Sequence, residues 1–262
     1  MLTFSLTLIL GAVLGLCVGS FLNVVIYRVP KKESLWWPSS HCACGAPIPA
    51  YYNIPVLSWL LLRGKSACCH QPIPVRYPLV ESLTGLIFAL LVWRFYPDFG
   101  TLLVFQLFSA ALLVAFFIDL DHMEIPDRVT IGGSFVAAIL LVFAPQWLLT
   151  TRMDALWGFL LGTTLVAWIN FFCMLIIKRE GMGWGDAKLL SLIGLLTGWH
   201  GVLFSFFAGA ILGTLFIVIR SWVLREGLKK GKEVPFGPMI LVGTLVYLFG
   251  GWAIVEMYLR TL

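Results

Sequence analysis

The sequence predicts an all-α polytopic membrane protein, with about eight transmembrane helices and one larger cytoplasmic loop between the first and the second. Of its 262 residues, 60% are apolar and only 12% are charged, whereas a soluble domain is about 45–50% apolar and about 25% charged. This composition also excludes a disordered chain, which needs low hydrophobicity and high charge. In addition, the apolar residues are gathered in runs that approach the roughly 20 residues of a transmembrane helix.

The apolar runs, taken in chain order, define the expected spans. They are residues 2–27, 77–95, 101–118, 129–143, 155–177, 187–198, 202–219 and 236–259. The first run is expected to be a retained span, because no basic residue precedes it and it exceeds the roughly 7–15 apolar residues of a signal peptide. The longest segment between spans is the loop 28–76, which leaves no room for an autonomous soluble catalytic domain. We therefore expect two domains: 1–95, which includes this loop, and a six-span membrane domain at 96–262.

The basic residues predict how the chain crosses the membrane. If the spans alternate in direction, one side receives the loops 28–76, 119–128, 178–188 and 220–235, which hold 15 of the 18 Lys and Arg residues. The positive-inside rule places these loops in the cytoplasm and both termini on the opposite side. The formal net charge of +5 therefore reflects membrane orientation. No basic–aromatic face indicates a nucleic-acid partner, and the stretch 220–232 is expected to bind anionic lipid at about 1 kcal/mol per charge.

Two segments place acidic residues at the ends of spans, where an ionisable group is costly and suggests a functional site. The third span runs directly into Asp119, Asp121, Glu124 and Asp127. The sixth span opens with Gly-Met-Gly-Trp-Gly-Asp at 181–186, which ends in Asp186. Because the third span ends and the sixth begins on the cytoplasmic side, these carboxylates are expected at the same depth.

Two carboxylates at one depth can perform aspartyl-protease chemistry. Like charges about 3 Å apart cannot both ionise, so the pair shares a proton. One group then acts as a base on water while the other donates a proton to the scissile carbonyl, and the glycines beside Asp186 let a substrate backbone approach. The alternative is that Asp186 only caps its helix and the other acids form a solvated loop. Spacing does not choose between Asp119 and Asp121, but positions i and i+2 share no helix face, so only one of them readily meets Asp186.

Several motifs, in order along the chain, resemble those of the bacterial type IV prepilin leader peptidases. They are Gly-Ser-Phe-Leu-Asn-Val-Val-Ile-Tyr-Arg-Val-Pro at 19–30, Asn-Ile-Pro-Val-Leu-Ser-Trp-Leu at 53–60, Arg-Gly-Lys at 63–65, Arg-Tyr-Pro-Leu-Val-Glu at 76–81, the acidic run at 119–127, Gly-Met-Gly-Trp-Gly-Asp at 181–186 and Val-Pro-Phe-Gly-Pro at 234–238. The resemblance implies an aspartyl peptidase of the Gly-x-Gly-Asp type, related in mechanism to presenilin. It also implies that Asp119 and Asp186 are the catalytic pair.

The resemblance further implies substrates, a location and a second activity. The enzyme would remove the basic leader from prepilins and pseudopilins at the cytoplasmic face of the inner membrane, with both termini periplasmic. It would then methylate the new N-terminal residue with S-adenosylmethionine. No Gly-x-Gly-x-x-Gly motif follows a strand, so the methyl donor is expected between the large loop and the helix ends, on residues that the sequence does not identify. Asp121, Glu124 and Asp127 are expected to attract the basic leader.

The cysteines of the large loop depart from the family pattern. The family has two Cys-x-x-Cys pairs, about the spacing of a four-thiolate zinc site, but the matching positions here are His41 and Cys44, then Ser66 and Cys69. Disulfides are disfavoured in a reducing compartment. Two readings stay open. One is a shifted zinc site with ligands from the set His41, Cys42, Cys44, Cys68, Cys69 and His70. The other is a metal-free loop held by aromatic packing.

Two alternative functions make different predictions. A proton- or cation-coupled transporter would carry its acids near the membrane midplane, whereas the middles of these spans carry no charge. A peptidase-only member of the same family would cleave without methylating. The sequence does not choose between a pilus, a DNA-uptake system and type II secretion as the source of substrates.

Overall fold

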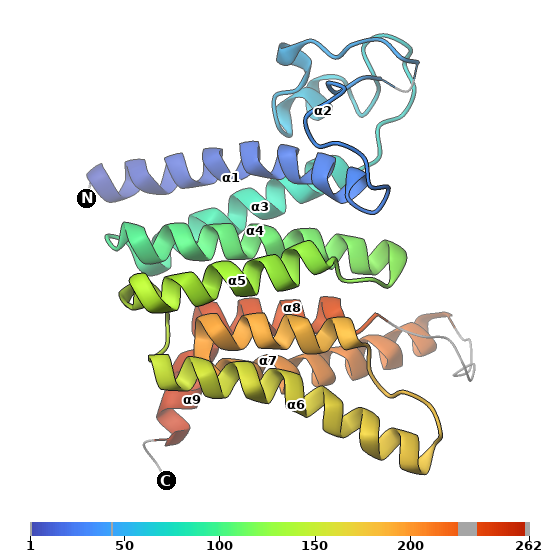
Figure 1. Cartoon of the computed structure of the whole chain (residues 1–262). Helices are drawn as coiled ribbons and strands as arrows, with labels where there is room; N and C mark the ends of the chain where they lie inside the picture. Colours follow the sequence, from blue (N-terminus) through green and yellow to red (C-terminus); the bar gives the residue numbers. More distant parts are fainter. Residues whose placement is uncertain (1, 43, 225–234, 260–262) are drawn as a thin grey trace. The chain divides into compact units, whose positions relative to one another are not determined.

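The computed structural model describes residues 2–42, 44–224 and 235–259, and these form helices joined by loops, with no strand among them (Figure 1). The helices are α1 (Leu2–Arg28), α2 (Leu57–Leu61), α3 (Arg76–Phe95), α4 (Phe99–His122), α5 (Asp127–Phe143), α6 (Arg152–Ile176), α7 (Trp184–Leu224), α8 (Gly237–Val246) and α9 (Trp252–Leu259). Short 3-10 turns lie at Ala50–Tyr52 and Pro145–Trp147, and a π-helical segment at Tyr247–Gly251 joins α8 to α9. Most of the lysine-rich stretch 220–232 falls outside these ranges.

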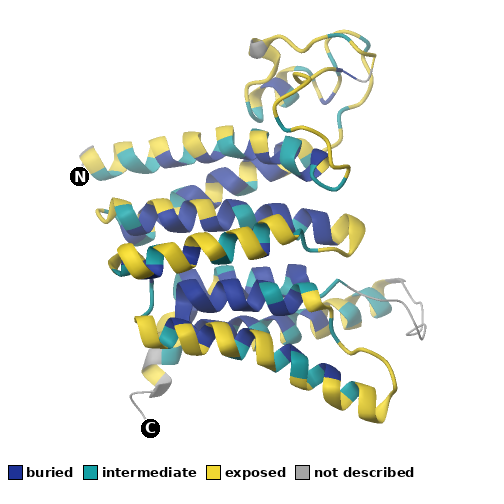
Figure 2. Ribbon diagram, viewed as in Figure 1, coloured by how far each residue is buried: buried dark blue, intermediate teal, exposed yellow. Residues whose placement is uncertain are grey.

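Six of the helical stretches within the described ranges are long and apolar enough to cross a membrane. They are Thr3–Arg28, Arg76–Phe95, Phe99–His122, Arg152–Ile176, Trp184–Val223 and Gly237–Val255. Large apolar residues are exposed along α1, α5 and α6, and Figure 2 colours much of these three helices as exposed. Such surfaces suit contact with lipid tails, which are as apolar as leucine. The chain is therefore an all-helical polytopic membrane protein.

Two features account for the difference between these six stretches and the eight spans that the sequence predicts. The helix α5 has 17 residues, which is slightly short of the roughly 20 that cross the bilayer. The helix α7 has 41 residues, and Gly198 interrupts it with φ 75° and ψ −179°. Positive φ favours glycine, which lacks a Cβ. Figure 1 shows α7 as two limbs that run in opposite directions.

The chain forms two compact units, Met1–Val114 and Ala115–Leu262, and the boundary falls inside α4. In the first unit α1 packs on α3 through a stripe of glycines, Gly11, Gly15 and Gly19. A Cβ added at Gly15 would lie 2.7 Å from the Thr84 carbonyl oxygen, so the backbones are in direct contact. Small residues allow this close approach between membrane helices.

In the second unit, α7 packs against both α6 and α8. Glycines again make the contacts: a Cβ added at Gly158 of α6 would lie 2.7 Å from the carbonyl oxygen of Gly194 in α7. Hydroxyl pairs add hydrogen bonds between these helices. Thr163 and Ser191 lie 2.7 Å apart across α6 and α7, and Thr244 donates to Ser205 at 3.1 Å across α8 and α7. This packing holds the start of α7, which carries Asp186.

Candidate active site

The second unit brings together two carboxylates that are far apart in the sequence. Asp119 lies in the last turn of α4, and Asp186 lies in the first turn of α7. Both side chains are buried, with 5% and 7% of their surface exposed. They are also close enough for the charge of Asp119 to act on Asp186. The arrangement therefore contains a buried pair of interacting acids.

Backbone N–H groups from two other segments hold these carboxylates. The N–H of Gly237, the first residue of α8, donates to the Asp119 carboxylate. The N–H of Gly183 donates to the Asp186 carboxylate. A Cβ added at Gly237 would lie 2.5 Å from Asp119 Oδ2, so only glycine fits at this position without displacing the acid. The motif at 234–238 thus contributes a direct partner of Asp119, a role that sequence reasoning did not assign.

Ile125 packs against the glycines on both sides of the pair. A Cβ added at Gly185 would lie 3.3 Å from Ile125 Cβ, and one added at Gly237 would lie 3.0 Å from Ile125 Cδ1. The acidic run therefore contributes an apolar contact as well as carboxylates. This contact joins the segment after α4 to the starts of α7 and α8.

Asn170 of α6 holds the glycine-rich segment before Asp186. Its side-chain oxygen accepts hydrogen bonds from the N–H groups of Gly181 and Met182, at 3.0 and 2.9 Å, and its Nδ2 donates to the Met182 carbonyl at 2.9 Å. Asn170 is buried, and it fastens an irregular loop to a membrane helix. Sequence reasoning missed this residue, although a polar amide inside the apolar run 155–177 was a signal for it.

The other three acids of the run, Asp121, Glu124 and Asp127, are exposed. Asp127 forms an ion pair with Lys188, whose Nζ lies 2.6 Å from Asp127 Oδ1. Both partners are substantially exposed, and exposed ion pairs contribute about 0–1 kcal/mol. The pair links the start of α5 to the start of α7 and offsets one of the negative charges expected to attract a leader.

In the first unit, four cysteines of the large loop meet. The sulfur atoms of Cys42, Cys44, Cys68 and Cys69 all lie within 4.8 Å of one another. Cys42 Sγ lies 3.4 Å from Cys69 Sγ, and Cys44 Sγ lies 3.3 Å from Cys68 Sγ. His41 lies outside this group; its Nδ1 is 3.2 Å from the Ser39 carbonyl oxygen. His70 also lies outside it.

The geometry and chemistry of the cysteine cluster fit a zinc ion. In a tetrahedral site with Zn–S bonds of about 2.3 Å, the sulfur atoms lie about 3.8 Å apart. The sulfur atoms here are separated by similar distances, from 3.3 Å for Cys44 and Cys68 up to at most 4.8 Å within the group. A hydrogen bond from the Cys44 backbone N–H is the largest of several that lower the pKa of Cys42 to about 6. Its hydrogen bond to Cys42 raises the pKa of Cys68 to about 12. The lowered pKa of Cys42 favours its thiolate, and the thiolate is the metal-binding form.

Known proteins are similar to this chain along most of its length. Residues 13–95 match the bacterial Peptidase A24 N-terminal domain, and residues 106–218 match the type IV leader peptidase family. The chain is 34% identical to a prepilin leader peptidase/N-methyltransferase of Stutzerimonas stutzeri, over 95% of this chain and 92% of that protein. It is 34% identical to the protein of that name from Pseudomonas putida, over 92% and 90%. It is 41% identical to that of Myxococcus xanthus (strain DK1622), over 79% and 62%. No solved structure matches the chain significantly.

Proposed function

The chain belongs to the type IV leader peptidase family, and we propose that Asp119 and Asp186 are the two carboxylates with which it cleaves prepilin leaders. The observation that supports this assignment is the buried, electrostatically interacting pair at the ends of α4 and α7. Asp121 shares the acidic run with Asp119 but is exposed. Burial of two interacting acids favours a state in which only one of them is ionised, and Asp119 and Asp186 are both buried.

The proposed cleavage uses one ionised and one protonated carboxyl group. The ionised group accepts a proton from water, and the water oxygen attacks the scissile carbonyl carbon. The protonated group donates to the carbonyl oxygen as the tetrahedral intermediate forms. Collapse of the intermediate breaks the C–N bond, and a proton passes to the leaving amine. The N–H donors of Gly183 and Gly237 hold the two carboxylates in position during these steps.

We further propose that the chain crosses the inner membrane eight times. A straight helix of 41 residues would be about 60 Å long, twice the roughly 30 Å of the hydrocarbon core. The break at Gly198 supports two crossings by α7, and α5 supplies the eighth span. Both termini are then periplasmic, and the 15 basic residues and the acid pair face the cytoplasm. Labelling of single engineered cysteines from each side of the membrane tests this topology.

We assign the second activity, N-methylation of the cleaved pilin with S-adenosylmethionine, to the region 1–95, and cleavage to 96–262. In the first region the four cysteines would hold zinc. A bound zinc ion would join the turn that carries Cys42 and Cys44 to the turn that carries Cys68 and Cys69. It would thereby give the loop a defined shape. The substrates are prepilins or pseudopilins, whose basic leaders the acids Asp121, Glu124 and Asp127 would attract.

Substitution of each carboxylate tests the catalytic assignment. Asp119→Asn and Asp186→Asn should each abolish removal of the leader from a coexpressed prepilin, because each removes half of the shared-proton pair. Asp121→Asn, an equal loss of charge two residues from Asp119, is the matched control and should be milder. Immunoblotting separates precursor from mature pilin and reports the amount of enzyme in the membrane. Cleavage near the wild-type rate by either pair variant would show the assignment to be wrong.

A further inference from the structure

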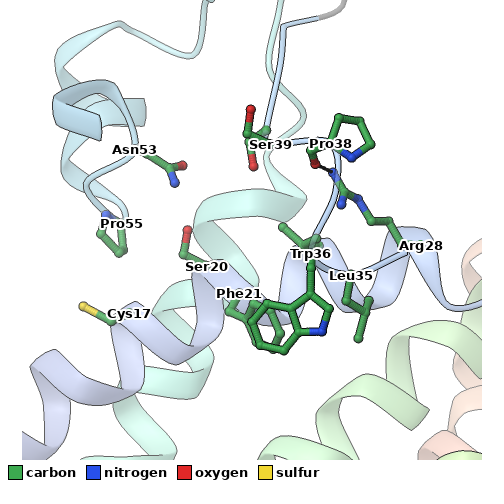
Figure 3. Close-up of a pocket in the computed structure, with 12 residues that line it drawn as sticks. Cys17, Ser20, Phe21, Arg28, Leu35, Trp36, Pro38, Ser39, Asn53 and Pro55 are labelled. Carbon is green, nitrogen blue, oxygen red and sulfur yellow. Dashed lines mark hydrogen bonds between the residues drawn. The ribbon is translucent and has the colours of Figure 1, made fainter. Parts of the chain in front are cut away.

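The first unit contains a cavity of about 350 Å³ between the second half of α1 and the loop that follows it (Figure 3). Its volume lies within the roughly 300–1,000 Å³ of small-molecule sites. One wall belongs to α1 and includes Ser20, Phe21 and Arg28. The other belongs to the loop and includes Trp36, Ser39 and Asn53.

Arg28 carries a buried positive charge into this cavity. Its side chain is 8% exposed, and its Nη1 and Nη2 donate to the carbonyl oxygens of Ser34 and Pro38, at 2.8 and 2.7 Å. These neutral carbonyls are its hydrogen-bond partners, and no carboxylate among the residues with assigned structure neutralises it. A guanidinium group has five N–H donors, so three remain for a ligand. Buried charges in proteins are ordinarily paired, and Arg28 therefore indicates that the cavity receives an anionic group.

The rest of the cavity offers aromatic faces and small polar groups. Trp36 is 86% exposed, so its indole ring is free to stack on a planar ligand, and Phe21 also lines the cavity. The hydroxyls of Ser20 and Ser39 and the amide of Asn53 also line the cavity. Such groups bind sugar hydroxyls.

A buried acid holds the two walls together. Glu81 of α3 is buried, and its Oε2 accepts a hydrogen bond from the backbone N–H of Val56 at 2.7 Å. It also accepts one from the Ser20 hydroxyl. Val56 adjoins Pro55 of the loop wall, while Ser20 belongs to the α1 wall. Glu81 thereby fastens the loop to α1 and α3, and the cavity is formed before any ligand binds.

We propose that this cavity binds S-adenosylmethionine, the methyl donor of the second activity, on whose assignment the inference rests. The carboxylate of the donor would meet Arg28, its adenine would stack on Trp36 and Phe21, and its ribose hydroxyls would meet the serines and Asn53. The donor supplies a methyl group. The pilin amine forms an N–C bond as the S–C bond of the donor breaks, and the donor becomes a neutral thioether. The methylated ammonium then releases a proton to water. The position between the large loop and the end of α1 is the one expected from the sequence.

Direct binding to the purified full-length protein tests the proposal. Equilibrium dialysis with radiolabelled S-adenosylmethionine should show affinity weakened about fivefold or more by Trp36→Ala, the effect of losing one base-stacking ring. Trp37→Ala is the matched control, because Trp37 is 78% exposed in the same loop and does not line the cavity. Arg28→Gln should also weaken binding, and Arg28→Lys should restore part of it. Leader removal should stay at the wild-type rate in Trp36→Ala.

The outcomes separate this proposal from the proposed function. Wild-type affinity in both Trp36→Ala and Arg28→Gln would overturn the cavity as the donor site, and so would a wild-type protein that cleaves prepilin yet binds no donor. An enzyme that cleaves no prepilin would instead contradict the peptidase assignment. The anion at Arg28 could also be a lipid headgroup, so binding is repeated in phosphatidylcholine and phosphatidylglycerol nanodiscs. If Arg28→Gln alters only the retention of phosphatidylglycerol and leaves donor affinity unchanged, the proposal is overturned.

Discussion

Each carboxylate of the proposed pair depends on groups that carry no charge. Asp119 and Asp186 each accept a hydrogen bond from a glycine N–H, and each of these glycines belongs to one of the sequence motifs. Asn170 in turn fixes the segment that precedes Asp186. At the scale of residues, the site is therefore a set of backbone donors positioned around two acids. Such preorganised donors hold charged groups without later rearrangement.

Asn170 provides a test of this positioning. Asn170→Leu would leave two N–H groups and one carbonyl of the glycine-rich segment without their partner, at about 1–3 kcal/mol for each buried group. We expect kcat for leader removal to fall by about tenfold or more, with protein still in the membrane. Thr163→Ala, which removes the hydrogen bond to Ser191 in the same helix pair, is the control and should leave kcat near wild type. An unchanged kcat in Asn170→Leu would contradict the positioning role.

The exposed acids provide a second test at this scale. A variant with Asp121→Asn, Glu124→Gln and Asp127→Asn should have a raised KM for prepilin and a flatter dependence of kcat/KM on salt, because attraction between exposed charges is screened by salt. Since Asp127 already pairs with Lys188, we expect Glu124→Gln alone to have a larger effect than Asp127→Asn alone. Cleavage measured from low to high ionic strength checks both points. A salt dependence equal to that of the wild type would mean that these acids stabilise the loop that carries them and do not attract the leader.

At the scale of elements, glycine contacts decide how the membrane helices pack. Burial of apolar side chains drives little association between helices in lipid, so close backbone contact and interhelical hydrogen bonds matter more. The α1–α3 contact in the first unit and the α6–α7 contact in the second both use this arrangement. The break at Gly198 is a different use of glycine, because its positive φ lets one helical run reverse direction.

Gly15 tests the packing of α1 on α3. In Gly15→Ala the new Cβ would lie 2.7 Å from the Thr84 carbonyl oxygen and 2.8 Å from Gly85 Cα, and neither backbone atom can rotate away. We expect a loss of about 1–3 kcal/mol, the usual cost of overpacking, seen as a lower thermal unfolding midpoint in detergent. Gly132→Ala on α5 is the control, because its Cβ would meet no atom within 4 Å. A midpoint in Gly15→Ala equal to that of Gly132→Ala would contradict the close contact.

At the scale of the whole molecule, the chain divides into two units, and we propose that each carries out one of the two chemistries. The buried acid pair belongs entirely to the second unit, while the cysteine cluster and the cavity with Arg28 belong entirely to the first. Peptide hydrolysis needs the acids and water. Methyl transfer needs a donor site that also receives the freed amine. Damage confined to the first unit should therefore separate the two activities.

The four cysteines test this separation. Replacing Cys42, Cys44, Cys68 and Cys69 together by Ser should leave leader removal largely intact and lower methylation of the mature pilin. Mass spectrometry reads each methylation as a gain of about 14 mass units, and metal analysis of the purified protein should show zinc in the wild type and not in the variant. Loss of cleavage in the variant would show that the loop is needed for both activities, which contradicts their separation. Unmethylated pilin from the wild type would favour a peptidase without the second activity.

The sequence by itself determined the membrane class, the expected orientation and the acidic segments, because composition, run length and loop charge are local properties that the bilayer constrains directly. The motifs also determined the family. Only the tertiary structure decided that Gly237 and Asn170 hold the acidic site, that Asp127 pairs with Lys188 and that the four cysteines meet without His41. Membrane helices that are apolar on every side carry no periodicity to mark an inward face. Which side chains meet is therefore set by the rotation and close packing of helices, and that information is not local in the chain.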